Sequence, residues 1–367
     1  MAGLYVHVPF CAGRCPYCDF ASTTDLSLIP AYLEAVKREV ETSPDFGVFD
    51  TLYFGGGTPG ILPEQEMETL FGVLRSRFCF SRDAEVTVEM NPECVTKRRV
   101  VFLRSLGVNR LSIGIQSLND DELRFLGRRH TARQALEAVF RAHDAGCANI
   151  SADLICGFDG QTILSWTDTL SRLVGEPVSH LSAYQLTVKE GTPFGNMRDK
   201  GQLCLLSEDE EAAFFEATCG FFRQAGWTHY EVSNYCRGPQ YACRHNILYW
   251  RHQPYLGIGP SAASFDGRRR WRNAEDVSDY CRLVEEKGSG RISEECLTDE
   301  QLHLEKVALA LRTAEGVAEE SVSDTARTRR ALEHLEKEGI VSRRAGRIVP
   351  TEKGFLLADG LPLLLLD

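Results

Sequence analysis

The first two-thirds of the chain alternates between short runs rich in β-branched and aromatic residues and longer runs with helical spacing. The short runs predict strands at 4–8, 51–54, 85–89, 110–114, 149–155 and 180–184. The longer runs predict helices at 31–41, 63–77, 96–106, 132–145 and 163–174. A helix after each strand returns the chain to the same end of the sheet, so the strands are expected to be parallel. We therefore expect an α/β fold whose parallel sheet is either open or closed into a barrel.

The pattern changes after about residue 267. Helical spacing predicts helices at 299–312 and 328–339, and two short strands at 340–344 and 347–350 flank Ala345-Gly346, a hairpin turn. Two helices and a hairpin resemble a small winged-helix unit, which in many proteins binds DNA. The net charge is −11, with 41 basic and 52 acidic residues, which favours a packing or lid role over nucleic-acid binding. We expect a core at 1–235, a connecting region at 236–297 and a C-terminal module at 298–367.

Polar residues and glycines gather where the predicted strands end. Cys11 follows the first strand, Gly55 the second and Gln116 the fourth, while Glu89 ends the third and Asp153 lies near the end of the fifth. Parallel strands end at one edge of the sheet, and ligands bind at that edge in α/β proteins. The sequence therefore predicts one binding site built from these residues.

The chain has 13 cysteines, no basic-then-apolar leader at Met1–Phe10 and no apolar stretch long enough to cross a membrane. We expect a cytoplasmic protein, in which cysteines are reduced and most serve as small core residues. Three of them lie within eight residues, in Cys11-Ala-Gly-Arg-Cys15-Pro-Tyr-Cys18. Such a density of thiolates is typical of a metal or iron–sulfur site.

Two kinds of site fit this C-x₃-C-x₂-C spacing. Zinc usually takes four ligands, and Cys94, Cys236 or Cys243 would have to supply the fourth. A [4Fe–4S] cluster held by only three thiolates leaves one iron open, and that iron can bind the amino and carboxylate groups of S-adenosylmethionine (SAM). Gly13 and Pro16 favour the turns that a short loop needs to wrap a cluster. The position after an N-terminal strand favours the cluster.

The motif, with an aromatic residue before its last cysteine, resembles the radical SAM superfamily. That resemblance implies a partial (β/α)₆ barrel, one [4Fe–4S] cluster held by Cys11, Cys15 and Cys18, and one SAM. Gly55-Gly-Gly-Thr-Pro59 resembles the segment that holds the SAM amino group in this superfamily, with Thr58 where that segment has a glutamate.

The order of motifs along nearly the whole chain resembles the oxygen-independent coproporphyrinogen III oxidases (HemN) and their relatives, the HemW haem chaperones. The shared motifs include Gly257-Ile-Gly-Pro-Ser-Ala-Ala-Ser264 and the C-terminal module. The resemblance implies that the SAM site is formed by Tyr5, Tyr17, Gly57, Thr58, Glu89, Gln116, Arg128, Asp153, Thr187 and Ala263.

Three features favour the chaperones over the oxidases. The oxidases have a further cysteine two residues after the last cluster cysteine, where this chain has Phe20, and they carry a longer N-terminal extension. The third feature is His245-Asn-Ile-Leu-Tyr-Trp250, which matches an HNxxYW signature of HemW and follows a matching Glu231-Val-Ser-Asn-Tyr235.

The chemistry of the HNxxYW motif fits haem, since imidazole is a common axial ligand and aromatic rings stack on porphyrins. We therefore expect His245, Tyr249 and Trp250 to bind haem. Cys243 and His252 are neighbouring alternatives for the axial ligand. The alternative without haem is a structural turn in which the histidine is hydrogen-bonded and the tryptophan is in the core.

Three functions remain open at this stage. The first is a haem chaperone that delivers haem to acceptor proteins, such as respiratory ones, and uses an electron donor. The second is a coproporphyrinogen III oxidase, and the third is another radical SAM enzyme acting on a tetrapyrrole. Phe20 and the HNxxYW motif favour the first and predict no coproporphyrinogen oxidation. We expect no nucleic-acid partner and at most peripheral contact with a membrane.

Overall fold

A run of neighbouring parallel strands forms the centre of the molecule. The computed structural model describes residues 2–366. It confirms the α/β fold expected for the radical SAM superfamily, and each predicted core strand is present. The parallel strands are β1 (Gly3–Val8), β2 (Val48–Gly56), β3 (Cys79–Met90), β4 (Arg110–Gln116), β5 (Asn149–Cys156), β6 (His180–Gln185) and, on the other side of β1, β9 (Tyr255–Ile258).

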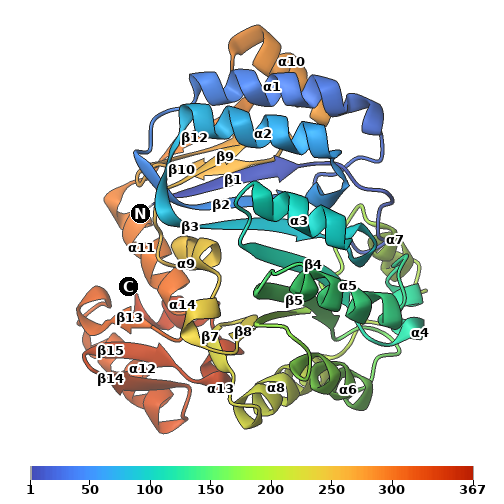
Figure 1. The fold of residues 1–367 in the computed structure, drawn as a ribbon. Coiled ribbons are helices and arrows are strands. Elements are labelled where there is room, and N and C mark those ends of the chain that lie inside the picture. The colour runs from blue at the N-terminus through green and yellow to red at the C-terminus, as the bar shows by residue number, and fades with distance from the viewer. Residues whose placement is uncertain (1, 367) are drawn as a thin grey trace.

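Helices between the strands cover the outer face of this curved sheet (Figure 1). They are α1 (Ile29–Thr42), α2 (Glu64–Arg77), α3 (Lys97–Ser105), α4 (Asp120–Phe125), α5 (Ala132–Asp144) and α6 (Ile163–Val174). Helix α1 shows why the sequence folds in this way. Tyr32, Val36 and Val40 recur every four residues, lie on one helical face and are at most 1% exposed.

The sheet continues beyond the parallel strands at both ends, which the sequence pattern did not predict. Its order is β12-β11-β10-β9-β1-β2-β3-β4-β5-β6-β8-β7, so it is open between β12 and β7. The added elements are α7 (Pro193–Asp199), α8 (Glu208–Gln224), β7 (Thr228–Glu231), β8 (Asn234–Cys236), α9 (Arg244–Trp250), β10 (Ala263–Phe265), β11 (Arg269–Asn273), α10 (Val277–Lys287) and β12 (Arg291–Cys296). The core of this large unit is continuous from Ala2 to Val284.

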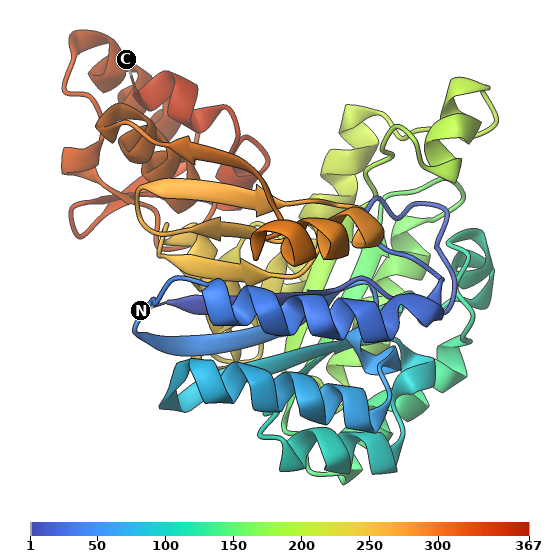
Figure 2. The ribbon, with the colours of Figure 1, turned by 90° about the horizontal axis from the view of Figure 1, so that it is seen from above.

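The C-terminal module has its own small core, which includes Val307, Leu332 and Ile348. Its elements are α11 (Asp299–Ala310), β13 (Val317–Ala318), α12 (Ala326–Lys337), β14 (Val341–Arg344), β15 (Arg347–Pro350), α13 (Glu352–Phe355) and α14 (Leu361–Leu365). The three strands form an antiparallel sheet in the order β13-β15-β14, and the expected hairpin turn joins the last two. Figure 1 shows this module beside α9 and β7, and α11 contacts α9. Figure 2 shows the module at one side of the main sheet.

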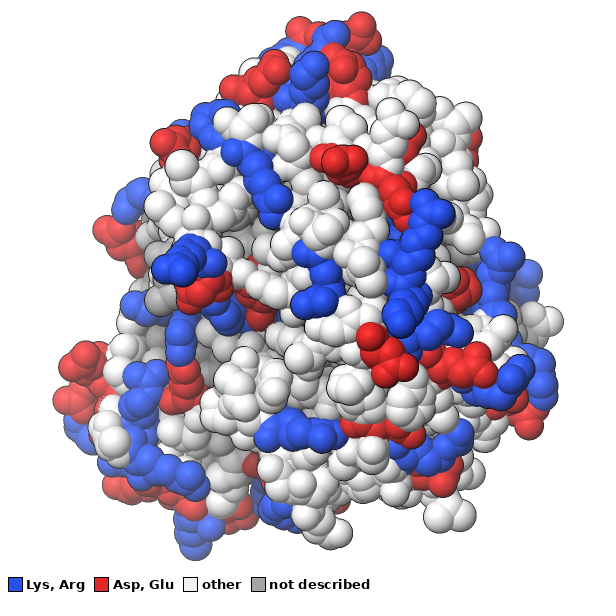
Figure 3. Space-filling model, in the orientation of Figure 1, with Lys and Arg blue, Asp and Glu red and all other residues white. Residues whose placement is uncertain are grey.

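The surface carries both signs of charge in mixture. Over the face in Figure 3, basic and acidic side chains are scattered among uncharged residues, and this face has no broad basic area. Among the helices of residues 2–366, none has both the length and the apolar character needed to cross a bilayer.

Candidate functional site

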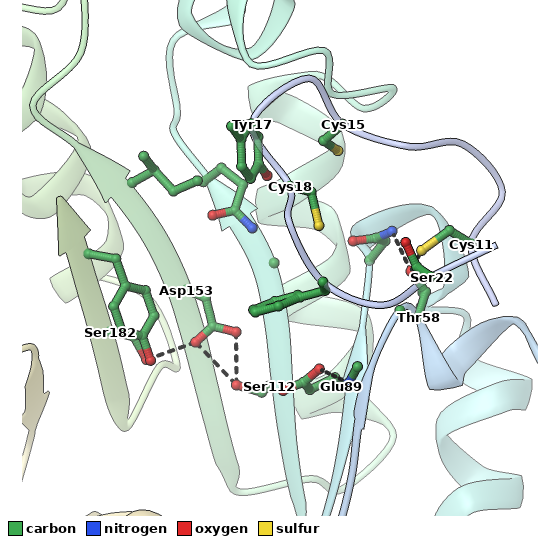
Figure 4. A pocket seen from close by; sticks show the side chains of 18 of the residues that line it. Cys11, Cys15, Tyr17, Cys18, Ser22, Thr58, Glu89, Ser112, Asp153 and Ser182 are labelled. Carbon is green, nitrogen blue, oxygen red and sulfur yellow. Dashed lines mark hydrogen bonds between the residues drawn. The ribbon is translucent and has the colours of Figure 1, made fainter. Parts of the chain in front are cut away.

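The loop between β1 and α1 brings Cys11, Cys15 and Cys18 to the carboxyl end of the sheet. The loop is fixed by backbone hydrogen bonds, from Cys11 N to Thr23 O (2.9 Å) and from Cys18 N to Cys15 O (3.2 Å). All three thiols line a cavity of about 350 Å³, here called the cluster cavity. Figure 4 shows them on one loop above the strand ends. Burial raises the pKa of Cys11 and of Cys18, so these thiols are protonated in the metal-free chain at neutral pH.

The glycine-rich end of β2 forms one wall of the cluster cavity. Gly56 has φ +109°, which only glycine adopts easily. A Cβ on Gly57 would lie 2.7 Å from the carbonyl oxygen of Phe10, so the close approach of this segment to the cysteine loop also requires glycine. The Thr58 hydroxyl lies 3.6 Å from Cys11 Sγ and accepts a hydrogen bond from Asn91 Nδ2. Thr58 therefore connects the cysteine loop with the residue that follows β3, Asn91.

Two carboxyl groups on strands, Glu89 on β3 and Asp153 on β5, face the same cavity. Glu89 accepts hydrogen bonds from the Tyr53 hydroxyl (2.7 Å) and from Gly56 N (3.1 Å). Burial raises the pKa of Glu89 to about 7. Asp153 accepts hydrogen bonds from the hydroxyls of Ser112 and Ser182, at 2.9 and 2.8 Å, and burial raises its pKa as well (Figure 4). Each carboxyl keeps oxygen atoms that can accept a ligand's hydroxyl groups.

Arg128 joins the cysteine loop to the strand ends. Its guanidinium donates to Asn91 Oδ1 (2.6 Å), to the carbonyl of Gly114 (2.8 Å) and to Cys15 Sγ (3.5 Å). Its Nε is buried and has no partner among the described residues. A carboxylate is the ligand group that best satisfies a guanidinium in such a position.

The structure divides the residues predicted for SAM between two adjoining cavities. The cluster cavity is lined by Tyr17, Gly57, Thr58, Glu89, Gln116, Arg128, Asp153 and Thr187. Tyr5 and Ala263 line a second cavity of about 590 Å³, here called the tyrosine cavity, and Glu89 belongs to both. The predicted residues thus gather at one end of the sheet, around two neighbouring spaces.

The geometry of the cysteine loop fits a [4Fe–4S] cluster. Each cluster thiolate binds a different iron, so three thiols spread around one cavity suit it. Within residues 2–366, no three His, Cys, Asp or Glu side chains lie close enough to share one metal ion. The thiols suggested for a zinc site lie elsewhere: Cys236 and Cys243 are fully buried, and Cys94 packs against Gly60. They provide no fourth ligand at the loop.

Sequence reasoning missed the floor of the cluster cavity. Arg110 is 2% exposed, lines the cavity and has two guanidinium nitrogens without a partner in the described chain. Ser112 follows it by two residues on the same face of β4, and Ser182 lies in a similar position on β6. Polar residues at every second position of an otherwise apolar strand are the signal that would have found these residues.

The HNxxYW motif lies in α9, which packs against β2 and places His245 and Leu248 beside Gly3, at the start of β1. The Glu85 carboxylate caps this helix by accepting a hydrogen bond from His245 N (3.1 Å). The His245 ring is 2% exposed and stacks on Tyr53, with centroids 4.9 Å apart. Its Nδ1 lies 2.6 Å from Thr51 Oγ1 and its Nε2 lies 2.9 Å from the Tyr249 hydroxyl. Both ring nitrogens are therefore engaged, and an iron could bind only after one hydrogen bond breaks.

The other residues considered for haem are also held by protein contacts. Cys243 is fully buried, with Sγ 3.7 Å from Glu85. His252 stacks on Phe265 and lies 3.2 Å from the Glu305 carboxylate of the C-terminal module. Trp250 lies under the guanidinium of Arg312, 5.5 Å from its ring centre. Tyr249 differs from these residues because it lines the tyrosine cavity. The haem ligand stays a prediction.

Comparisons with known proteins agree with this architecture. The model of the radical SAM superfamily matches residues 5–173. The heme chaperone HemW of Mycobacterium tuberculosis H37Rv is 33% identical over 99% of this chain and 94% of its own length. HemW of Bacillus subtilis 168 is 32% identical over 98% of this chain and 97% of its own length. Among solved structures, coproporphyrinogen III oxidase (HemN) from Escherichia coli, a radical SAM enzyme, superposes with a TM-score of 0.84 at 25% identity, over 99% of this chain and 89% of that one.

Proposed function

The chain belongs to the HemW family of radical SAM proteins, and from this we propose that it is a haem chaperone. It binds haem together with a [4Fe–4S] cluster and SAM, and it delivers haem to acceptor proteins. The observation that carries this proposal is the similarity to named HemW proteins along almost the full length of both chains. The cysteine loop supports it, since Phe20 stands where the oxidases have a further cysteine.

The cluster is held by Cys11, Cys15 and Cys18, whose loop lies above the glycine-rich end of β2. When bound and reduced, the cluster supplies an electron to the sulfonium of SAM. Metal binding requires the thiolate form, so cluster assembly releases protons from thiols whose pKa is raised by burial. Assembly is therefore expected to be more complete at mildly alkaline than at acidic pH.

The SAM site is formed by residues that meet complementary groups of the ligand. Glu89 and Asp153 accept hydrogen bonds from ribose hydroxyls, and Arg128 pairs with the carboxylate. Backbone groups of Gly57 and Thr58 would bind the amino group, and Tyr17, Gln116 and Thr187 line the same cavity. Tyr5 and Ala263 complete the site from the tyrosine cavity.

The proposal also covers the domain boundaries, the location in the cell and the partners. We place the core barrel at 1–235, the connecting region with the HNxxYW motif at 236–297 and the C-terminal module at 298–367. The protein acts in the cytoplasm, receives electrons from a donor protein and gives haem to respiratory or other haem proteins. We expect no nucleic-acid partner, because the net charge is −11.

The test that separates the chaperone from the oxidase uses coproporphyrinogen III. The full chain, reconstituted without oxygen and reduced, is incubated with SAM and this substrate, and porphyrins are separated by chromatography. A chaperone forms no protoporphyrinogen above the level of a Cys11→Ala control. Steady, catalytic formation of protoporphyrinogen contradicts the proposal and favours the oxidase.

A further inference from the structure

Arg110 is a buried cation on the floor of the cluster cavity. Its side chain is 2% exposed and lines the cavity from β4. Nη2 lies 3.4 Å from His180 Nδ1, and Nε and Nη1 have no hydrogen-bond partner among the described residues. A guanidinium stays charged in a protein, and burying that charge without a hydrogen-bonded carboxylate destabilises the fold. The proposed SAM contacts do not use this charge, so it calls for another explanation.

The two carboxyl groups of the SAM site lie on the strands at either side of Arg110. In the sheet, β4 lies between β3, which carries Glu89, and β5, which carries Asp153. Ser112 follows Arg110 by two residues, so both side chains are on the same face of β4. The Ser112 backbone is the register partner of Glu89, and its hydroxyl donates to Asp153 at 2.9 Å. Because all four side chains line the cluster cavity, Arg110 and the two carboxyls face one space.

Burial works against the ionised form of both carboxyls. It raises the pKa of Glu89 to about 7 and also raises the pKa of Asp153. The positive charge of Arg110 acts in the opposite direction on the pKa of each. An ionised carboxyl accepts hydrogen bonds through both oxygens, whereas a protonated one turns one oxygen into a donor. The charge state of these groups therefore determines how well they accept the hydroxyls of a ribose.

The other groups around Arg110 leave its charge available to the two carboxyls. Glu85, on β3, accepts hydrogen bonds from the backbone N–H groups of Arg244 and His245, and so caps α9. Burial keeps the remaining neighbours uncharged at neutral pH, because it shifts the pKa of each away from 7: His180 downwards, and Cys243, Tyr53 and Tyr230 upwards.

The other charged residues that line the cavity are placed differently. Arg128 donates to the Gly114 carbonyl at 2.8 Å, near the end of β4, where the proposed function pairs it with the SAM carboxylate. Three more are exposed, so that solvent screens their charges: Arg14, Asp19 and Lys189. Arg110 is thus the buried cation at the deeper side of the two carboxyls.

We propose that Arg110 is a positioning residue of the SAM site, which serves as the counter-charge of Glu89 and Asp153 and keeps both ready to accept the ribose hydroxyls of SAM. The proposal rests on the SAM site of the proposed function. It also explains the unused nitrogens of the guanidinium. A direct ion pair would occupy the carboxylate oxygens that the ribose needs, whereas a nearby charge without a hydrogen bond favours ionisation and leaves these oxygens free.

The experiment measures SAM binding at two pH values. Full chains of wild type, Arg110→Met and Arg110→Lys are reconstituted without oxygen, and SAM affinity is measured by equilibrium dialysis at pH 6 and pH 8.5. Arg110→Met removes the charge; a rise of about one unit in the carboxyl pKa weakens binding about tenfold at pH 6 and less than about twofold at pH 8.5. Arg110→Lys keeps the charge and is expected to restore most of the affinity at pH 6. The control is Arg99→Met, because Arg99 is also a buried arginine but donates to the Leu62 carbonyl and lies outside the cavity.

A second measurement does not depend on SAM. Infrared spectra of the SAM-free chain at pH 7 report protonated carboxyl groups, and Arg110→Met is expected to show more of them than wild type or Arg110→Lys. Adding Glu89→Gln to Arg110→Met should remove part of the new signal, which assigns it to the SAM site. Arg110→Gln gives a second uncharged variant, so that a folding defect in one variant does not decide the result.

A purely structural role of Arg110 predicts a different pattern. The uncharged variants would then weaken SAM binding equally at both pH values, Arg110→Lys would not recover it, and the infrared signal would stay unchanged. Any of these results overturns the proposal, as does wild-type affinity of the uncharged variants at pH 6. If wild type itself does not bind SAM, the SAM site of the proposed function fails, and the infrared comparison still decides whether Arg110 controls the carboxyls.

Discussion

Replacing His245 with alanine tests whether the histidine of the HNxxYW motif supports the fold. The ring is buried between Tyr53 and Tyr249 and joins the Thr51 and Tyr249 hydroxyls. Alanine leaves a cavity of nearly the size of the imidazole and two buried hydroxyls that lose a partner. The combined cost is about 3–5 kcal/mol of unfolding free energy.

Urea unfolding of the metal-free chain, followed by tryptophan fluorescence, measures this cost. His245→Gln is the matched variant, because its amide retains a donor and an acceptor, and it should lose only about 1–2 kcal/mol. A loss below about 1 kcal/mol in His245→Ala would refute the buried hydrogen-bonded network. In Soret titrations, recovery of haem binding by added imidazole in His245→Ala would identify a ligand role, whereas a purely structural role of the ring predicts no recovery.

The same histidine predicts a pH dependence. Burial lowers the pKa of His245 to about 3, whereas an unfolded histidine has a pKa of about 6.5. Between these values the unfolded chain binds the extra proton, so this contribution to stability is complete above pH 6.5 and is lost as the pH falls. The stability difference between wild type and His245→Ala should shrink by about 1.6 kcal/mol from pH 6.5 to pH 5. A difference that stays constant would contradict the burial of a neutral ring.

Three further variants test other parts of the account. Changing Cys11, Cys15 and Cys18 together to Ala should abolish the [4Fe–4S] absorption after anaerobic reconstitution, and full iron loading would disprove their role as ligands. Arg128→Met should weaken SAM binding about tenfold in equilibrium dialysis while the cluster still forms, because one charged pair is lost; an unchanged affinity would remove Arg128 from the SAM site. Glu39 on α1 is buried and accepts hydrogen bonds from Gly259 N (2.8 Å) and the Tyr280 hydroxyl (2.6 Å). Burial raises its pKa to about 7, so the unfolding free energy of wild type relative to Glu39→Gln should fall as pH rises from about 4.5 to 7. Urea unfolding at pH 5 and pH 8 measures this, and equal differences at both would show that the carboxyl is ionised in the folded chain.

The parallel sheet and the cluster loop could be predicted from the sequence because both depend on local signals. Strand and helix periodicity located β1 to β6 and five of the helices between them, but it missed α4, and β3 begins at Cys79 rather than at the predicted Glu85. The spacing of Cys11, Cys15 and Cys18 lies within one loop, so no long-range information was needed. The extension through β10, β11 and β12 was missed because its short strands carry many charged residues, as in Arg269–Asn273.

Long-range contacts explain what the sequence could not provide. The residue types in HNxxYW suggested that His245 could bind the haem iron. Only the fold shows that its two ring nitrogens are hydrogen-bonded to Thr51 and Tyr249. Arg272 lies among other arginines on β11, and only the folded chain brings it to the tyrosine cavity.

The most direct test of the haem-chaperone function is a transfer measurement under anaerobic conditions. The full chain with its cluster and SAM is loaded with one equivalent of haem and mixed with an apo-haem protein, and the Soret band is followed after separation of the two proteins. The account predicts saturable binding of haem to the chain and transfer to the acceptor faster than spontaneous release into buffer. Haem that does not bind saturably, or that reaches the acceptor no faster than it is released, would contradict it.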